Sequence, residues 1–402
     1  MPEIKPFKAY RYNKAIVKNF NNVLTPPYDV ISAEDQIKLY KKSPYNFVRI
    51  DLRKKTKAQD PYTGAQKQLK QWLKKGVFES ESEESIYVYI QDYKNLDGKK
   101  AKRIGFLSLM KIKPTKVKKH EYTLSGPKKD RMKLLGAMGS QLSPIMGLFQ
   151  DKPGKVNQVL KKSLKKKCAI DVTLSGVRHR IIVEKNPTNI AKICELMRDK
   201  NMYIADGHHR FEVTNSFRLA NPQLKKAAYM MTYFCDGSNN DFTIYPTHRV
   251  LNDLGKGWTD KFVKCAMRDF VVNEFKSLAA LEAAMSTAPK GKVNIGCYTG
   301  KAYLNLTTKK TTKDLDTTVL HKKFILPLLG EEVAVSKRIQ FTRDAKEAST
   351  KVKQKKADIA FFLSKMPVSE MIRISDEGVK LPQKSTYFYP KLLSGIALYK
   401  FD

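Results

Sequence analysis

The segment from Met202 to Thr214 constrains the fold most, because its pattern predicts a strand, a glycine turn and a helix in direct succession. Tyr203-Ile204-Ala205 is an apolar run typical of the end of a buried strand. Asp206-Gly207 is a turn sequence, and the apolar residues of 208–219 are compatible with a helix. This arrangement aims backbone N–H groups and the positive end of the helix dipole at an anion. We therefore expect a phosphate site at this turn.

The side chains at the turn support the same expectation. Gly207 lets the backbone approach an anion closely. His208, His209 and Arg210 add donors beside the start of the helix, and they include two of the six histidines of the chain. The alternative is an ordinary Asp-Gly turn that precedes a helix and binds nothing.

Length and composition predict a globular protein of two or three domains, since the chain has 402 residues of which 42% are hydrophobic. The five cysteines are dispersed without C-x-x-C spacing, which suits a reducing cytosol and gives no support for a zinc or redox motif. The first residues lack the apolar segment of a secretory signal, and no apolar run approaches the ~18 residues of a membrane span. We expect a cytoplasmic protein with no membrane partner.

The net charge is +37, from 76 Lys and Arg against 39 Asp and Glu. Such a charge attracts nucleic acid, anionic membranes or acidic metabolites. The basic residues are spread through nearly every segment, a pattern more typical of a solvated lysine-rich surface than of one dedicated groove.

Hydrophobic periodicity predicts a mixed α+β chain. We expect helices at 62–75, 128–138, from Pro187 onward, 208–219, 278–285 and 319–329. Expected strands are 86–93 paired with 104–112, 145–149, 172–174 paired with 180–183, 229–235, 293–298 paired with 303–306, and 359–363. Breaks near 113 and 251 divide the chain into an N-terminal α/β region (1–112), a central core (113–250) and a C-terminal α+β region (251–402).

A second candidate for chemistry is His120-Glu121, in a predicted loop after a basic segment. A carboxylate beside phosphate-binding groups can take a proton from a hydroxyl nucleophile, or it can hold Mg²⁺. The alternative is a surface glutamate. Lys128 and Arg131 lie one helical turn apart, so they either present two positive groups together or form a solvated face.

Weaker candidates for substrate contact share polar side chains next to a rigid or apolar segment. They are Tyr28 and Asp29 after Pro26-Pro27, His248 and Arg249 after an apolar strand, and Lys384, Ser385 and Thr386 in a hydroxyl-rich segment that ends at Lys391. The sequence contains no P-loop, no G-x-G-x-x-G, no G-x-S-x-G and no protein-kinase signature, so any phosphate is bound by another device.

Ordered motifs along the whole chain resemble the bacterial domain-of-unknown-function family 1015. The motifs are Pro26 to Val30, Tyr45-Asn46, His120-Glu121 with Thr123, Pro127-Lys128, Asp130-Arg131, Ser143-Pro144, Asp206 to Arg210, Pro246 to Arg249, and Lys384 to Lys391. Because that family is poorly characterised, this resemblance implies little about mechanism.

Asp206-Gly207-His208-His209-Arg210 is also similar to the nucleotide-phosphate motif of free serine kinases, which belong to the ParB/sulfiredoxin-like superfamily. The order of a His-Glu pair, a helix, a Pro-Ile strand and this turn is shared over roughly residues 113 to 235. The resemblance implies a central ParB/sulfiredoxin-like nucleotide-binding domain flanked by N- and C-terminal α/β regions. A long insertion between Ile145 and Tyr203 departs from the compact kinases.

The same resemblance implies roles for individual residues. Glu121 matches the catalytic base, Asp206 would orient substrate or metal, and His208 would complete the catalytic set. Gly207, His208, His209 and Arg210 would bind nucleotide phosphates, and His120 would lie near the substrate.

These observations lead to three functional hypotheses. The first is a small-molecule kinase that uses ATP or ADP with Mg²⁺ and phosphorylates a hydroxyl metabolite, with free L-serine as the expected acceptor. The second is a ParB-like, nucleotide-switched protein that binds nucleic acid, although the chain shows no helix-turn-helix or RNP-type motif. The third is a nucleotide sensor without catalysis. The choice of ATP or ADP, the metal ligands and the oligomeric state stay open.

Overall fold

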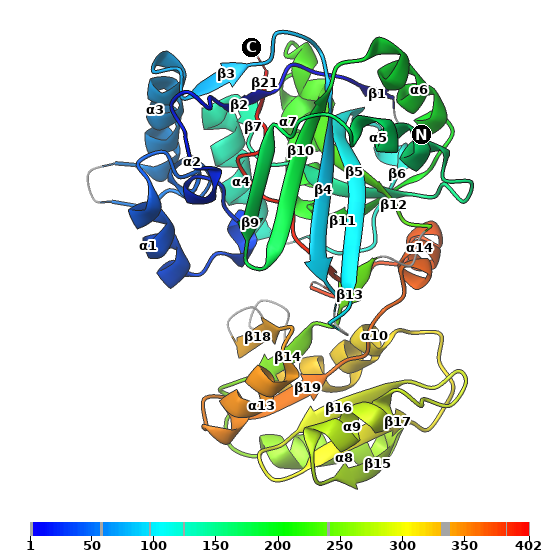
Figure 1. Ribbon diagram of the computed structural model, residues 1–402. Helices are drawn as coiled ribbons and strands as arrows, with labels where there is room; N and C mark the ends of the chain where they lie inside the picture. The colour runs from blue at the N-terminus through cyan, green and yellow to red at the C-terminus, as the bar shows by residue number, and fades with distance from the viewer. Residues whose placement is uncertain are drawn as a thin grey trace. The chain divides into compact units, whose positions relative to one another are not determined.

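The structure, a computed structural model, describes residues 3–56, 59–95, 98–123, 125–238, 242–330, 338–382 and 384–401. The chain forms two compact units (Figure 1). The first comprises Met1–Thr243, Ser375–Gly378 and Phe388–Asp402, and the second comprises Ile244–Ile374 and Val379–Tyr387. Helices and several sheets occur together, so the predicted α+β class is confirmed.

Among the described residues, nine strands of the first unit form one sheet in the order β6-β11-β8-β12-β5-β4-β10-β9, with β1 beside β5. Neighbouring strands are antiparallel except for β6–β11 and β8–β12, which are parallel. The bounds are β1 (Ile4–Lys5), β4 (Ile86–Lys94), β5 (Lys100–Lys111), β6 (Val117–Lys118), β8 (Ile145–Phe149), β9 (Ile170–Leu174), β10 (Val177–Glu184), β11 (Met202–Asp206) and β12 (Tyr229–Asp236).

This sheet crosses the break that the sequence places near 113. β5 ends at Lys111 and pairs with β12 from Tyr229↔Lys111 to Cys235↔Gly105. Residues on both sides of the expected break therefore share one ladder of hydrogen bonds and one unit, where the sequence divides them. The second expected break, near 251, falls in β14 (His248–Leu251), shortly after the start of the second unit.

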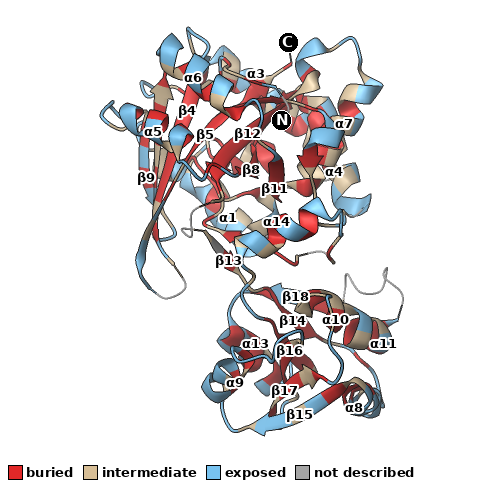
Figure 2. Cartoon of the chain, turned by 90° about the vertical axis from the view of Figure 1, so that its right-hand side faces the viewer, coloured by how far each residue is buried: buried red, intermediate tan, exposed pale blue. Residues whose placement is uncertain are grey.

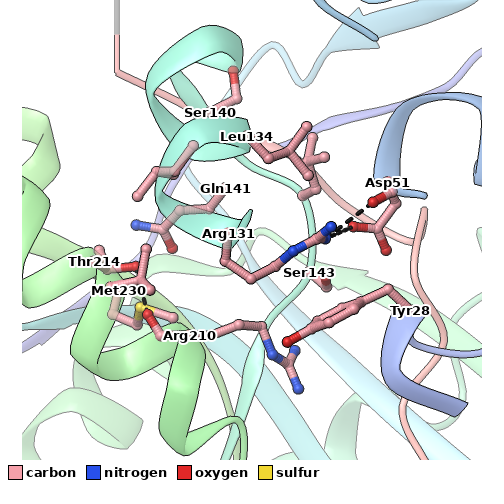
Figure 3. A pocket seen from close by; sticks show the side chains of 13 residues that line it. Tyr28, Asp51, Arg131, Leu134, Ser140, Gln141, Ser143, Arg210, Thr214 and Met230 are labelled. Carbon is pink, nitrogen blue, oxygen red and sulfur yellow. Dashed lines mark hydrogen bonds and ion pairs between the residues drawn. The ribbon is translucent and has the colours of Figure 1, made fainter. Parts of the chain in front are cut away.

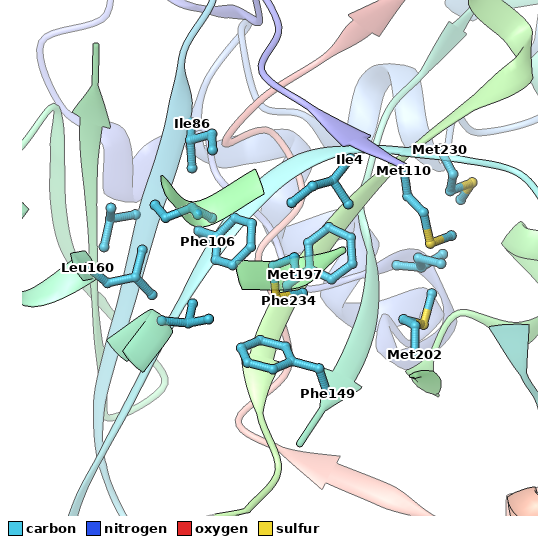
Figure 4. Close-up of a cluster of buried hydrophobic side chains, with 14 of the residues drawn as sticks. Ile4, Ile86, Phe106, Met110, Phe149, Leu160, Met197, Met202, Met230 and Phe234 are labelled. Carbon is cyan, nitrogen blue, oxygen red and sulfur yellow. The ribbon is translucent and has the colours of Figure 1, made fainter. Parts of the chain in front are cut away.

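One apolar cluster of the first unit gathers alternate residues of the strands, which point to the same face of the sheet. Ile86, Phe106 and Phe149 from three strands gather with Leu160 of α5 (Lys155–Ser163) and Met197 of α6 (Pro187–Met197) (Figure 4). Burial of each such side chain contributes about 1.5–3 kcal/mol. Figure 2 shows the buried strands between surface helices whose outer faces are exposed.

The predicted insertion between β8 and β11 forms α5, β9, β10 and α6. β10 adds to the sheet beside β4, from Arg178↔Asp92 to Glu184↔Ile86. α5 and α6 contribute to the same apolar core. The insertion thus extends the sheet at β4, while β8 and β11 stay direct neighbours.

The remaining elements of the first unit surround this sheet, and α4 packs against both α3 and α7. The helix predicted at 62–75 is α3, which Asp60 caps by accepting from the N–H groups of Tyr62 and Thr63, and which Gly76 follows with φ +67°. The bounds are β2 (Tyr10–Tyr12), η1 (Phe20–Asn22), η2 (Tyr28–Val30), α1 (Ala33–Lys42), α2 (Val48–Asp51), α3 (Pro61–Lys74), β3 (Phe78–Ser80), η3 (Pro114–Lys116), α4 (Ser125–Met138), β7 (Ser140–Gln141), α7 (His208–Ala220), η4 (Lys225–Ala228) and β21 (Tyr399–Lys400).

The second unit contains an antiparallel sheet in the order β15-β17-β16-β19-β14-β18, with an apolar cluster on each face. Its strands and helices are α8 (Trp258–Asp269), β15 (Phe270–Phe275), α9 (Leu278–Met285), β16 (Asn294–Tyr298), β17 (Tyr303–Thr308), α10 (Asp316–Leu320), η5 (His321–Ile325), α11 (Leu326–Leu329), β18 (Ile339–Thr342), α13 (Ala345–Lys353) and β19 (Ile359–Phe362). Three further elements, β13 (Thr243–Tyr245), α14 (Val368–Asp376) and β20 (Tyr387–Tyr389), lie in the sequence where the chain passes between the units.

The helix predicted at 319–329 is present but contains one π-helical turn, His321–Ile325. Pro327 explains this turn, because proline has no N–H for the carbonyl of Lys323 and its ring would clash there. Gly330 ends the segment with φ +80°.

Within the described part of the chain, no helix combines the length and the apolar composition that crossing a membrane requires.

Burial makes the stability of the first unit depend on pH through His179 of β10. Its Nδ1 lies 2.7 Å from the hydroxyl oxygen of Tyr89, and burial together with Arg103 lowers the pKa of His179 to about 3. Unfolded histidine takes up a proton near pH 6.5. The contribution to stability is therefore complete above pH 6.5 and is lost as pH falls below it, by about 2 kcal/mol at pH 5.

The free energy of unfolding of the wild type should fall by about 2 kcal/mol between pH 7 and pH 5 because of His179. We expect His179→Gln, which keeps an acceptor for Tyr89, to abolish this fall. Urea unfolding in a Trp258→Phe background tests this, since Trp72 then reports on the first unit alone. His321→Gln in the second unit is the control. Equal pH dependence in His179→Gln and its parent would contradict the assignment.

Candidate functional site

The turn between β11 and α7 has the predicted strand, glycine and helix geometry. Gly207 adopts φ +95° and ψ 28°, a left-handed conformation that favours glycine. A Cβ at this position would lie 2.7 Å from Cγ2 of Ile145 in β8. The backbone conformation and the neighbouring strand thus both require glycine. Helix α7 starts directly after Gly207, and no side-chain cap is found at this N-cap position in the described structure.

Parallel pairing brings the His-Glu segment to this turn. β6 runs beside β11 with Met202 opposite Val117 and Tyr203 opposite Lys118, so the residues that follow both strands emerge at the same edge. The rings of His120 and His208 meet edge to face, with their centroids 4.7 Å apart. Glu121, half-buried, is the next residue after His120.

An ion pair also joins the segment that contains His120 to α7. Lys119 pairs with Glu212, one turn into α7, and its ammonium also lies 5.9 Å from the ring centroid of Phe211. The imidazoles of His120 and His208 are buried, at 0% and 4% exposure. The side chain of His208 therefore packs on His120, and its expected contact with a phosphate stays a prediction.

A cluster of two cations and one carboxylate lies at the same turn. Arg210 Nη2 is 2.6 Å from Asp206 Oδ2, and Lys391 pairs with Asp206 Oδ1. Arg210 also donates to the carbonyl of Pro144. Among these three side chains two positive charges face one negative charge, an arrangement that suits an anion.

Lys391 was not among the site residues predicted from the sequence. The resemblance to family 1015 includes it at the end of the 384–391 motif, but nothing local in that motif points to Asp206. Asp206 is predicted to orient substrate or metal, and the structure shows both of its carboxylate oxygens in ion pairs with Arg210 and Lys391.

A pocket opens beside Arg210 (Figure 3). Arg131 Nη1 donates to the carbonyl oxygen of Asp51 at 3.0 Å and to its Oδ1 at 3.1 Å. The Arg131 guanidinium also lies over the ring of Tyr28, 4.0 Å from its centroid. The residues that line the pocket are Tyr28, Asp51, Arg131, Leu134, Leu135, Ser140, Gln141, Leu142, Ser143, Arg210, Val213, Thr214 and Met230.

Burial dominates the electrostatics of this pocket. It raises the pKa of the Asp51 carboxyl, while the guanidinium groups of Arg131 and Arg210 oppose the rise. It also raises the pKa of Tyr28 to about 12, so the phenol stays protonated at neutral pH and can donate a hydrogen bond. Asp51 is a lining residue that the sequence did not single out.

The other candidates near the first unit's pocket differ in exposure. Asp29 is exposed next to Tyr28, whereas Lys128 and His209 are half-buried. Arg131 turns into the pocket one helical turn after Lys128 on α4.

Five predicted substrate residues belong to the second unit. Arg249 Nη2 donates to the carbonyl of Lys384 at 3.2 Å, so the two motifs that contain them meet within that unit. His248 Nδ1 accepts from the N–H of Leu363 at 3.2 Å, and burial together with Arg249 lowers the pKa of His248 to about 4. Ser385 and Thr386, which follow Lys384 in the sequence, are also buried.

Metal ligation by the protein alone has no support in the described ranges, which contain no group of three or more His, Cys, Asp or Glu side chains placed to hold an ion.

A family model described as "Protein of unknown function (DUF1015)" matches residues 4–323. The chain belongs to this family. The predicted DUF1015 membership is thereby confirmed. A search of the curated proteins found no significant match to this DUF1015 chain.

Several solved structures are similar to this DUF1015 protein at low identity. A conserved hypothetical protein from Pyrococcus furiosus is 15% identical, covering 72% of this chain and 94% of that one, with a TM-score of 0.41. A free serine kinase in complex with AMP is 14% identical, covering 69% and 85%, with a TM-score of 0.41. SbnI with a C-terminal truncation from Staphylococcus aureus is 12% identical, covering 72% and 85%, with a TM-score of 0.39. Each TM-score is below 0.5, so an assignment of function depends on the chain's own residues.

The Gly207 turn generates a stability prediction with a matched control. Gly154 also precedes a helix, α5, with φ +66°, but a Cβ there would meet nothing within 4 Å. Gly154→Ala should cost roughly 1–2 kcal/mol for the left-handed backbone alone. Gly207→Ala should cost more, because its Cβ would also overlap Ile145. Urea unfolding of both variants compares the costs, and equal losses would contradict the role of Ile145.

Proposed function

We propose that this protein transfers a phosphoryl group from ATP or ADP to the hydroxyl group of a small metabolite, with free L-serine as the expected acceptor. The observation that carries the proposal is the contact between His120 and His208. Glu121 is the next residue along the chain, so this contact supports a position for it near the turn whose backbone suits a phosphate.

The start of α7 and the neighbouring cations would hold the nucleotide. The first N–H groups of a helix and its dipole favour negative charge. Arg210 and Lys391 add positive charge at the same point, and Asp206 holds both side chains in place. When bound, the nucleotide supplies the phosphoryl group.

Glu121 would act as the general base. The acceptor oxygen bonds to phosphorus as the P–O bond to the nucleotide breaks, and the hydroxyl proton passes to the Glu121 carboxylate. The products are a phosphate monoester and the nucleotide shortened by one phosphate. Arg210 would stabilise the negative charge that is spread over the transferred group.

Mg²⁺ would accompany the nucleotide as its counter-ion.

We expect the reaction in the cytoplasm, in agreement with five free cysteines.

Nucleic-acid binding is the second candidate, and the net charge of +37 motivates it. Direct binding to duplex DNA would weaken with salt at a log–log slope of about −0.9 per phosphate contacted. Binding of nucleotide without turnover would instead favour the sensor hypothesis.

The decisive assay mixes the protein with Mg²⁺, ATP or ADP, and a panel of hydroxyl metabolites that includes serine. Phosphorus NMR then detects any phosphate monoester. A new monoester signal with one acceptor supports the proposal, and the absence of product with every acceptor while nucleotide binds would overturn it.

Glu121→Gln should retain nucleotide binding and lower turnover by roughly 10²–10⁴-fold, because the amide cannot take the proton. Calorimetry measures the nucleotide affinity, and the NMR assay measures the rate. Glu212→Gln is the matched control, since it removes one carboxylate charge from the neighbouring first turns of α7. Unchanged turnover in Glu121→Gln would remove Glu121 from the mechanism.

A further inference from the structure

The face of the first unit's sheet that is turned away from the apolar cluster carries buried polar side chains. Val88 and Ile90 of β4 belong to the cluster. Because successive residues of a strand alternate, Tyr89 and Gln91 point to the other face. Arg103 of β5 lies directly opposite Gln91 in the register of the two strands. Gln91 is 0% exposed and Arg103 is 2% exposed, so the two side chains form a buried cross-strand pair.

The guanidinium group of Arg103 is buried without a carboxylate partner. Its Nε donates to Oε1 of Gln91 at 2.9 Å, and its Nη2 donates to the same oxygen and to the carbonyl of Pro390. Nη1 donates to the carbonyl of Tyr389 at 3.4 Å. Arg103 has no ion pair among the residues that the structure describes. A buried charge that only neutral oxygens oppose is costly, and costs of this kind are expected where a residue serves a site.

The main chain that this pair holds is the one that carries Lys391. Nε2 of Gln91 donates to the carbonyl of Lys391 at 3.0 Å. Two residues later, the N–H of Leu393 donates to the hydroxyl oxygen of Tyr89 at 3.3 Å. The Lys391 side chain pairs with Asp206 at the candidate phosphate turn. Three buried side chains from β4 and β5 therefore fix a stretch of backbone whose central ammonium group lies at the turn.

We infer that Arg103 and Gln91 are positioning residues for anion binding at the Gly207 turn. They fix the backbone of Lys391 and thereby hold its ammonium group beside Asp206. A lysine that is ordered before the anion arrives loses less conformational entropy when the anion binds. The inference rests on the proposed function, since the anion is the nucleotide's phosphate. It makes the site depend on β4 and β5, which lie outside the segment that resembles the free serine kinases.

The C-terminal segment has further anchors, so the pair can be weakened without releasing the end of the chain. β21 pairs with β7. Leu398 exchanges two backbone hydrogen bonds with Tyr10, at 3.1 and 2.9 Å. A substitution at Arg103 should therefore leave these contacts in place and act on the stretch around Lys391.

A double-mutant cycle tests whether Arg103 acts through Lys391. Arg103→Lys keeps the positive charge, but an ammonium group cannot form the planar fork that reaches three oxygens. Lys391→Met removes the ammonium group that faces the anion. Calorimetry measures the affinity for ADP with Mg²⁺ in the wild type, in both single variants and in the double variant.

We expect Lys391→Met to lower the ADP affinity about tenfold and Arg103→Lys to lower it roughly three- to tenfold. In the Lys391→Met background, Arg103→Lys should cause no further loss, because the residue that it positions is absent. A merely structural role would lower the free energy of unfolding and leave the ADP affinity of the folded protein unchanged. Equal ADP affinity in Arg103→Lys and the wild type, or a full further loss in the double variant, would overturn the inference.

Arg180→Lys is the matched control. Arg180 lies in the neighbouring strand β10, and its Nη2 is 2.7 Å from Oδ2 of Asp92 in β4. The same change of side chain there should leave the ADP affinity unchanged. If Arg103→Lys does not fold, Gln91→Met enters the same cycle, because methionine has a similar length and cannot donate to the carbonyl of Lys391. It should show the same non-additive loss, and additive losses would overturn the inference.

The inference and the proposed function fail in different ways. Non-additive losses of ADP affinity without phosphorylated product from any acceptor would refute the kinase and keep the positioning role. Phosphorylation at the wild-type rate with unchanged ADP affinity in Arg103→Lys would keep the kinase and refute the positioning role. A wild-type protein that binds no ADP would refute both.

Discussion

The parallel pairing of β6 with β11 is the constraint on which the candidate site depends. It sets Val117 opposite Met202 and Lys118 opposite Tyr203, so that the chain leaves both strands at one edge of the sheet. The His120–His208 contact and the Lys119–Glu212 ion pair follow from this register. A shift by one residue would turn the His120 side chain away from His208, because successive residues of a strand face opposite sides.

The positive cluster at the turn depends on the end of the chain. Lys391 reaches Asp206, whose other oxygen holds Arg210, and Arg210 also donates to the carbonyl of Pro144. A carboxylate with two cationic partners restricts the rotamers of both, which would reduce the entropy lost when an anion binds. Asp206 thus holds Arg210 and Lys391 beside the turn.

The pocket beside this cluster joins segments from three regions of the sequence. Tyr28 and Asp51 come from the N-terminal region, Arg131 from α4 and Arg210 from α7. Sequence reasoning singled out Tyr28, Arg131 and Arg210 as polar residues near rigid or helical segments. It missed Asp51, which stands in an unremarkable Ile-Asp-Leu context and gains its character from burial and from Arg131.

Local chemistry in the sequence was sufficient for the turn and for part of the elements, whereas helices such as α1, α8 and α13 were not predicted. The strand at 145–149 and the helix at 278–285 have the predicted bounds, and Gly207 has the left-handed backbone that its place between strand and helix requires. These features depend on residues close together in the chain, where periodicity and turn preference operate.

Only the tertiary structure decided which distant residues meet. It joined the two sides of the expected break near 113 in one sheet, brought Lys391 to Asp206, and grouped Arg249 with Lys384 in the second unit. The residue pattern around each position does not predict strand pairing across a sheet or ion pairs between remote segments. They are selected by the burial and hydrogen bonding of the whole fold.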